Sequence, residues 1–324
     1  MLSIAQDIKN NIFKRVYLLY GEETYLRLQY RDKLIKALVN DGDTMNYYYH
    51  EGKDVNVGEV IDMAETMPFL AEYRVIVLEN PDFNKEDGDK LAEYILTIPE
   101  STVLIIVEAE VDKRTKLFKA VSKAGKAAEF PIQSDETLKK WVMGKFKAEG
   151  KQATMNTLDV FLDMVGTDMA NIVTELEKLF SYTIGKDVIE VSDVKAVCTV
   201  TPSSRVFDMI DLMADRQTDK ALDMYHELIS MKQSPFGILA LIARQYNLML
   251  RISEMHDMPD SMIASKLGMS PYVVKKYYSK IKKYTMSQLR AAVKRCVETD
   301  EAIKYGNLEQ NLAVEMLIIE ESTL

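Results

Sequence analysis

The chain has 324 residues, of which 47% are apolar and 28% are charged, and its formal net charge is −9. This composition is ordinary for a globular protein, and the length suits two or three domains of roughly 100–200 residues each. The negative net charge excludes a nucleic-acid-binding coat over the whole surface but leaves room for a local basic patch. Two cysteines, Cys198 and Cys296, are too few for a disulfide scaffold and predict a reducing compartment.

The start of the chain, Met1 to Asp7, has no apolar core behind a basic segment, so no signal peptide is predicted. No apolar run approaches the ~20 residues that a membrane span needs. Together these observations predict a cytoplasmic protein.

Residues 1–134 alternate strand-like and helical patterns. The expected strands are Val16–Tyr20, Met45–Tyr49, Arg74–Leu78, Thr102–Val107 and Ala127–Phe130. The expected helices between them are Thr24–Asn40, Val57–Met67, Lys85–Leu96 and Lys113–Lys123. Three of the strands are nearly continuous in apolar residues, which is typical of strands buried on both faces. Strands separated by helices of this length predict βαβ units and a mostly parallel sheet.

From Asp135 onward the pattern is helical, apart from a brief strand-like run at Val188–Val191. The expected helices are Glu136–Glu149, Met155–Val165, Met169–Tyr182, Ser204–Asp215, Asp219–Met231, Pro235–Met255, Ser261–Leu267, Pro271–Ile281, Ser287–Lys304 and Leu308–Ser322.

Two prolines mark the expected boundaries between domains, because proline interrupts helices and restricts the residue before it. They are Pro131 and Pro202. We therefore predict an α/β domain at 1–134, a small three-helix domain at 135–203 and a larger helical domain at 204–324.

The segment Val16–Leu26, Val-Tyr-Leu-Leu-Tyr-Gly-Glu-Glu-Thr-Tyr-Leu, is an apolar strand followed by a glycine turn and the start of a helix. A P-loop protein would carry Gly-x-x-x-x-Gly-Lys-Ser/Thr here, and the amides and lysine of that motif bind phosphates. This turn holds one glycine, no lysine and two carboxylates, Glu22 and Glu23. The acids suit a helix N-terminus and would repel a triphosphate. The segment has the frame of a nucleotide-binding domain without its phosphate chemistry.

Residues that could perform catalysis occur singly. Glu108 follows the apolar run 104–107, where a nucleotide hydrolase carries its metal-binding carboxylate, but no phosphate-binding lysine accompanies it. His50, His226 and His256 lack a metal-ligand spacing, and neither cysteine lies in a nucleophile motif. We predict no catalytic, cofactor or metal site.

A cluster of apolar residues precedes the expected strand Arg74–Leu78. It consists of Met67, Pro68, Phe69 and Leu70. Turns normally carry small or polar residues, so large apolar side chains here need a reason. One interpretation is that they fold back over the sheet edge. The other is a hydrophobic plug that enters a partner's pocket.

The second unusual segment, Ser261 to Val297, contains nine basic residues and no Asp or Glu. The basic residues are Lys266, Lys275, Lys276, Lys280, Lys282, Lys283, Arg290, Lys294 and Arg295, and Tyr272, Tyr277, Tyr278 and Tyr284 lie among them. This pattern indicates either phosphate contacts with base stacking, or a helical face that meets an acidic neighbour. Within it, Ile263–Lys276 resembles a helix-turn-helix with Gly268 at the turn.

Taken together, these segments resemble the delta subunits of bacterial DNA polymerase III, the clamp-loader subunits that open the sliding clamp. The resemblance follows the chain in order and covers nearly all of it. Its most specific parts are the Tyr-Gly-Glu-Glu start and the Ile-Ala-Arg-Gln helix. The matching stretches are Val16–Leu26, Met67–Arg74, Leu104–Val107, Asp112–Arg114, Lys140–Trp141, Ile238–Gln245 and Leu267–Lys276.

The resemblance implies a fold. The N-terminal domain is expected to be AAA+-like, with a RecA-type parallel sheet and no P-loop. An all-α lid-like domain and an all-α collar domain are expected to follow. The chain is then a part of the DNA polymerase III holoenzyme without a catalytic site of its own.

The resemblance also implies partners. These are the sliding clamp (beta subunit), the other subunits of a clamp-loader heteropentamer, which use the ATP, and primed DNA within the complex. Phe69 and Leu70, flanked by Met67 and Pro68, are the expected clamp contact. Tyr305, next to Gly306 in a late helix, is a candidate for stacking on an exposed base. Two alternatives stay open: an AAA+-type ATPase with an atypical phosphate loop, and a DNA-binding regulator that uses residues 263–276.

Overall fold

The computed structural model describes residues 2–269 and 271–323. The chain divides into two compact units, Met1–Ile132 and Gln133–Leu324. In the described part of the chain, no helix is both long enough and apolar enough to cross a membrane.

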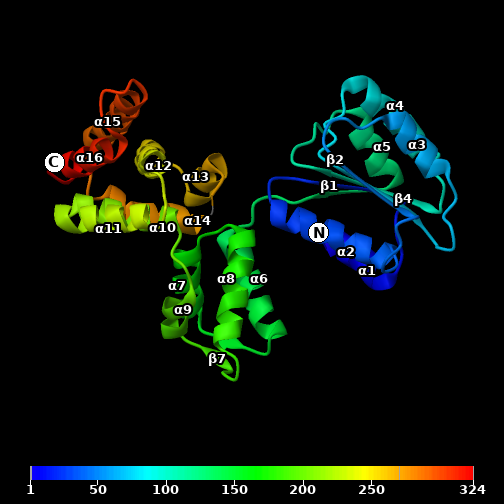
Figure 1. The fold of residues 1–324 in the computed structure, drawn as a ribbon, viewed down its shortest axis with the longest axis horizontal. Helices are drawn as coiled ribbons and strands as arrows, with labels where there is room; N and C mark the ends of the chain where they lie inside the picture. The colour runs from blue at the N-terminus through cyan, green and yellow to red at the C-terminus, as the bar shows by residue number, and fades with distance from the viewer. Residues whose placement is uncertain (1, 270, 324) are drawn as a thin grey trace. The chain divides into compact units, whose positions relative to one another are not determined.

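The first unit alternates helices with strands, as Figure 1 shows. Its helices are α1 (Leu2–Asn10), α2 (Thr24–Leu38), α3 (Val57–Glu65), α4 (Lys85–Ile95) and α5 (Lys116–Ala124). Its strands are β1 (Val16–Tyr20), β2 (Tyr47–Glu51), β3 (Arg74–Glu79), β4 (Thr102–Glu108) and β5 (Lys126–Glu129). Within the described residues they form a five-stranded sheet in the order β2-β3-β4-β1-β5, and every neighbouring pair is parallel. The predicted parallel sheet is therefore confirmed.

The central strands of this sheet are buried on both faces. Helices α3, α4 and α5 cover one face, and α1 and α2 lie on the other (Figure 1). All five residues of β1 are buried, and so are the five from Val75 to Glu79 in β3. This explains the continuous apolar runs in the sequence.

The most marked differences from the sequence expectation in the first unit concern α1 and β2. The helix α1 was not predicted. The second strand begins at Tyr47 rather than Met45, because the carboxylate of Asp43 accepts the amides of Met45 and Asn46 and so shapes a turn there.

Within the described residues, the second unit is helical apart from one short strand pair. Its first helices are α6 (Asp135–Ala148), α7 (Met155–Val165), α8 (Met169–Tyr182) and α9 (Val191–Val197). The strands β6 (Gln152–Ala153) and β7 (Val188–Ile189) pair in parallel. The helix α9 was not predicted, and it replaces the end of the expected strand Val188–Val191. Its N-terminus is fixed by a capping box between Glu190 and Asp193.

The remaining helices pack around α12 (Pro235–Glu254), which carries the wholly buried Tyr246. They are α10 (Pro202–Ala214), α11 (Thr218–Ser230), α13 (Asp260–Leu267), α14 (Pro271–Ile281), α15 (Met286–Lys304) and α16 (Gln310–Thr323). Their inward faces form one apolar core, so the predicted helical C-terminal part is confirmed.

Candidate functional site: an apolar loop before β3

The loop between α3 and β3 carries its large apolar side chains outward. Helix α3 ends at Glu65, two residues before the expected end, because Pro68 disfavours a helical conformation at Met67. Met67 is 81% exposed, Phe69 57% and Leu70 89%. These side chains therefore do not fold back over the sheet edge, which was the first of the two interpretations of this segment.

The backbone beneath these side chains is held by a buried polar residue. Asn46, from the segment before β2, is 3% exposed. Its side-chain amide accepts a hydrogen bond from the Phe69 amide at 2.7 Å and donates one to the Phe69 carbonyl at 2.8 Å. The Asp43 carboxylate accepts a further hydrogen bond from the same amide at 2.7 Å. Phe69 is thus fixed through both of its backbone groups.

Arg74, the first residue of β3, holds the start of the loop. Its guanidinium donates to the carbonyls of Thr66 at 2.8 Å, Met67 at 3.3 Å and Met45 at 3.3 Å. Met45 lies beside the loop through this shared guanidinium, and its side chain is 64% exposed. Sequence reasoning missed Met45 because the strand pattern placed it in β2.

The tip of the loop has an unusual backbone conformation. Leu70 has a φ of 54°, in the left-handed region that residues other than glycine seldom adopt. A strained tip persists only where its surroundings determine it, and here Asn46 and Arg74 supply the fixed contacts. The arrangement presents apolar side chains on a polar-anchored backbone, which suits insertion into an apolar pocket.

The turn after β1 is closed to a phosphate. The Gly21 amide donates to the Ala109 carbonyl at 3.2 Å, and the Glu23 amide donates to the Phe130 carbonyl at 2.9 Å. Amides that cradle phosphates must be free of such partners. A Cβ at Gly21, whose φ is 125°, would lie 2.4 Å from the Phe130 oxygen, so the glycine serves close packing here.

A buried arginine lies under the same turn. Arg27 is 5% exposed and donates to the carbonyls of Gly21 and Glu108. The Glu108 carboxylate accepts the amide of Asp82 at 3.0 Å, and burial raises the pKa of this carboxyl. Glu108, considered above as a metal-binding carboxylate, therefore organises the loop after β3. Within the described residues no cluster of three His, Cys, Asp or Glu side chains could hold a metal ion.

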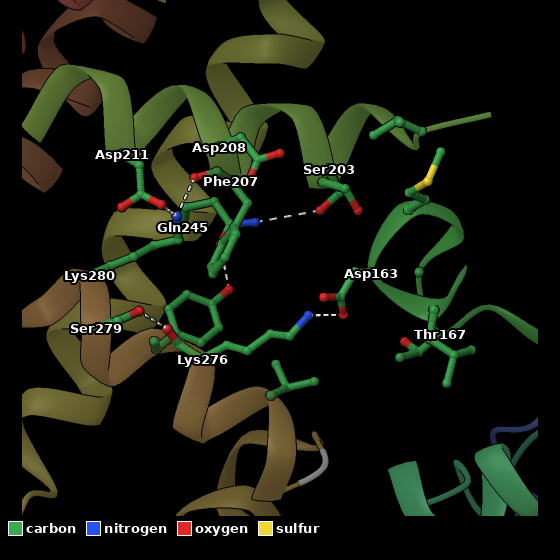
Figure 2. A pocket seen from close by; sticks show the side chains of 17 residues that line it. Asp163, Thr167, Ser203, Phe207, Asp208, Asp211, Gln245, Lys276, Ser279 and Lys280 are labelled. Carbon is green, nitrogen blue, oxygen red and sulfur yellow. Dashed lines mark hydrogen bonds and ion pairs between the residues drawn. The ribbon is translucent and has the colours of Figure 1, made fainter. Parts of the chain in front are cut away.

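Three lysines of the basic segment are used inside the second unit. Lys280 is buried, donates to the Phe207 carbonyl at 2.8 Å and pairs with Asp211. Lys283 pairs with the same aspartate at 3.3 Å, and Lys276 pairs with Asp163 of α7. Figure 2 shows these contacts of Lys276 and Lys280 around a cavity of about 540 Å³. The positive charge of these three lysines is matched by acidic side chains of the same unit.

The tyrosines of this segment are also engaged inside the unit. Tyr277 is buried and donates to Gln245, and Tyr278 donates to Asp260 at 2.6 Å. The Tyr284 ring packs edge-on against Tyr246. The side chain of Tyr272 lies outside the described part of the structure. Base stacking by the buried Tyr277 would require the helical core to open.

The remaining predicted residues lie on the surface. Lys275 and Lys282 are exposed, and Tyr305 is 79% exposed next to Gly306. In the helix-turn-helix-like segment, α13 and α14 are confirmed as helices, and Gly268 adopts a φ of 63° at the end of α13. Ser270 between them lies outside the described residues.

Comparison with known proteins identifies the family. A family model described as DNA polymerase III, delta subunit, matches residues 17–131. A second, DNA polymerase III delta subunit, C-terminal domain, matches residues 203–321. The chain belongs to the DNA polymerase III delta subunit family.

Two curated relatives and one solved structure match this delta-family chain over 71% to 100% of its length. DNA polymerase III subunit delta of Bacillus subtilis is 24% identical over 99% of this chain and 96% of that protein. The probable delta subunit of Aquifex aeolicus is 26% identical over 71% of this chain and 68% of its own length. The solved Bacillus subtilis DNA clamp loader delta protein matches with a TM-score of 0.73 at 23% identity, covering 100% of this chain and 99% of that chain.

These comparisons confirm the predicted family and a fold in which a parallel α/β unit is followed by helical parts. The two delta-family models leave residues 132–202 between them. The division at 134 and 203 and the individual binding residues stay predictions.

Proposed function

We propose that this delta-family chain binds the sliding clamp with the loop that contains Met67, Pro68, Phe69 and Leu70, and that it opens the ring for loading onto primed DNA. The observation that carries this proposal is the outward display of Phe69 and Leu70 on a backbone anchored by Asn46 and Arg74. A small apolar tip fits a pocket without requiring a large permanent interface.

The mechanism follows from differential affinity. A subunit that binds the open ring more tightly than the closed ring shifts that equilibrium toward opening, by as much as the two affinities differ. This step requires no nucleotide chemistry in the chain itself. The closed turn at Gly21 supports assigning ATP use to neighbouring subunits.

The proposal assigns a separate role to each of the three predicted domains. Residues 1–134 bind the clamp, 135–203 form the lid-like part, and 204–324 form the collar that joins the heteropentamer. Within the collar, the exposed Lys275, Lys282 and Tyr305 are the residues offered to DNA or to a neighbouring subunit.

The test replaces the two tip residues. Phe69→Ala with Leu70→Ala is expected to weaken binding to the sliding clamp at least ~100-fold, because each buried apolar side chain contributes about 1.5–3 kcal/mol. Surface plasmon resonance with the immobilised clamp measures this change. Leu96→Ala is the control, because Leu96 is 51% exposed in the same unit and lies outside the loop. Wild-type affinity in the double variant would contradict the assignment.

Calorimetry with ATP separates this function from an ATPase. The isolated chain is expected to give no binding heat, because the turn amides already have partners. Tight ATP binding would favour the AAA+-type ATPase instead. Sequence-specific binding of duplex DNA by the full chain would favour the regulator.

A further inference from the structure

An apolar tip binds more tightly when its conformation is set before the partner arrives. Ordering a flexible loop costs roughly 1–2 kcal/mol of backbone entropy per residue, and that cost is subtracted from the affinity. The loop 66–73 contains no regular secondary structure of its own. Its order must therefore come from contacts with the residues around it.

Asn46 supplies these contacts with an amide whose three principal hydrogen bonds are all in use. The oxygen accepts the Phe69 amide, while the nitrogen donates to the Phe69 carbonyl and to the Asp43 carboxylate. The Asn46 backbone amide also donates to Asp43 at 3.0 Å, which fixes the anchor itself. A carboxylate in this place could accept from Phe69 but could not donate, and an alanine could do neither.

We propose that Asn46 is a positioning residue for clamp binding: its buried side-chain amide holds the Phe69 backbone so that Phe69 and Leu70 point outward in the free subunit. This inference rests on the proposed function. Asn46 lies 23 positions before Phe69 in the chain and its side chain is buried, so it acts on the partner only through the loop.

The experiment measures clamp binding by full-length variants. Asn46→Ala is expected to lower the affinity for the purified sliding clamp about tenfold, with most of the loss in the association rate, because only the ordered fraction of loops can dock. Hydrogen exchange is expected to accelerate at the Phe69 amide while the amides of β3 from Ile76 to Leu78 stay protected. The thermal midpoint is recorded for each variant.

Asn84→Ala is the matched control for stability. Asn84 caps α4 by accepting the Asp87 amide at 3.0 Å, so its loss costs about 1 kcal/mol of helix stability in the same unit. It has no contact with the loop among its hydrogen bonds. If clamp affinity is unchanged in Asn84→Ala but reduced in Asn46→Ala, the loss comes from the positioning of the loop and not from a general destabilisation of the first unit.

The Asn46→Asp variant tests the positioning role through the pH dependence of clamp affinity, which a purely structural role of Asn46 would leave unchanged. The introduced carboxyl would face the Asp43 carboxylate, with the Arg74 guanidinium nearby. When ionised it has no donor for the Phe69 carbonyl, and when protonated it has one. The clamp affinity of Asn46→Asp is therefore expected to rise as the pH falls through the pKa of the new carboxyl. The clamp affinity of Asn46→Ala is expected to show no such rise.

The outcomes separate the two claims. Wild-type affinity in Asn46→Ala, while Phe69→Ala with Leu70→Ala abolishes binding, overturns the positioning role alone. Wild-type affinity in the tip double variant overturns the proposed function and this inference with it. Should Asn46→Ala fail to fold, the pH response of Asn46→Asp decides, and a flat response overturns the inference.

Discussion

Among the residues of the first unit that have positive φ angles, Gly21 and Leu70 adopt them for opposite reasons. Gly21 has a φ of 125° because the backbone of Phe130 lies where a side chain would begin. Leu70 has a φ of 54° although its side chain is 89% exposed and meets no such obstacle. Close packing demands the first conformation, whereas polar contacts to the neighbouring backbone maintain the second.

Gly21→Ala is expected to destabilise the first unit by at least ~2 kcal/mol, because the new Cβ would meet the Phe130 oxygen at 2.4 Å in addition to the backbone strain. Urea unfolding followed by circular dichroism measures the change. Gly42→Ala separates the two causes, since Gly42 has a φ of 80° with no atom within 4 Å of the built Cβ. Equal losses in both variants would show that strain alone, without the clash, explains the effect.

At the scale of elements, helix α14 combines an internal face with an external one. Lys280 and Tyr277 lie on the buried side, and Lys275 lies on the exposed side. The Lys280 ammonium also lies 3.7 Å from the centroid of the Phe207 ring. Such a buried cation is tolerated only when its hydrogen bonds are satisfied, and Asp211 with the Phe207 carbonyl satisfies them.

Lys280→Ala is expected to lower the free energy of unfolding of the second unit by about 2–3 kcal/mol, because it removes these buried contacts and leaves a cavity. Lys275→Ala, on the same helix, is expected to change it by less than ~0.5 kcal/mol. Chemical denaturation compares the two variants. Similar stabilities would mean that the Lys280 contacts contribute little net energy.

The sheet could be predicted from the sequence because β1, β3 and β4 are apolar at nearly every position, a pattern that few other elements share. The helix α1 and the true start of β2 could not. At β2 the decisive interaction is a hydrogen-bonded turn at Asp43, and such side-chain contacts leave no periodicity in the sequence.

The apolar loop was recognisable from its composition, but its anchors were not. Asn46 and Arg74 reach the loop through tertiary contacts, which one sequence does not reveal. In the basic segment the residues themselves were recognisable, but their partners were not. Lys276, Lys280 and Lys283 read as a possible DNA-binding surface because their acidic partners lie far away in sequence, on α7 and α10 or just after α10.

At the scale of the whole molecule, buried tyrosines make both units sensitive to alkali. Burial raises the pKa of Tyr225, Tyr277 and Tyr284 in the second unit to about 12, and it also raises the pKa of Tyr17 and Tyr94 in the first. The unfolded value is 10.0. Because the folded state keeps these protons longer, their contribution to stability is complete below that value.

Stability is therefore expected to fall as the pH rises from 10 toward 12. The tyrosinate absorbance of these buried tyrosines should appear together with the loss of helical circular dichroism. A pH titration that records both signals checks this expectation. Ionisation of every tyrosine with the helical signal intact would contradict the burial described here.

Because the Arg27 guanidinium lies beneath the Gly21 turn, this turn does not change its state with the ATP concentration. A bound nucleotide can dissociate, and its loss can change the conformation of the protein that held it. The Arg27 guanidinium is covalently part of α2, so it stays in place at every ATP concentration. The turn consequently has no empty and loaded forms between which to alternate. If the chain binds the clamp as proposed, control over exposure of the apolar tip therefore comes from contacts with neighbouring subunits and not from this turn.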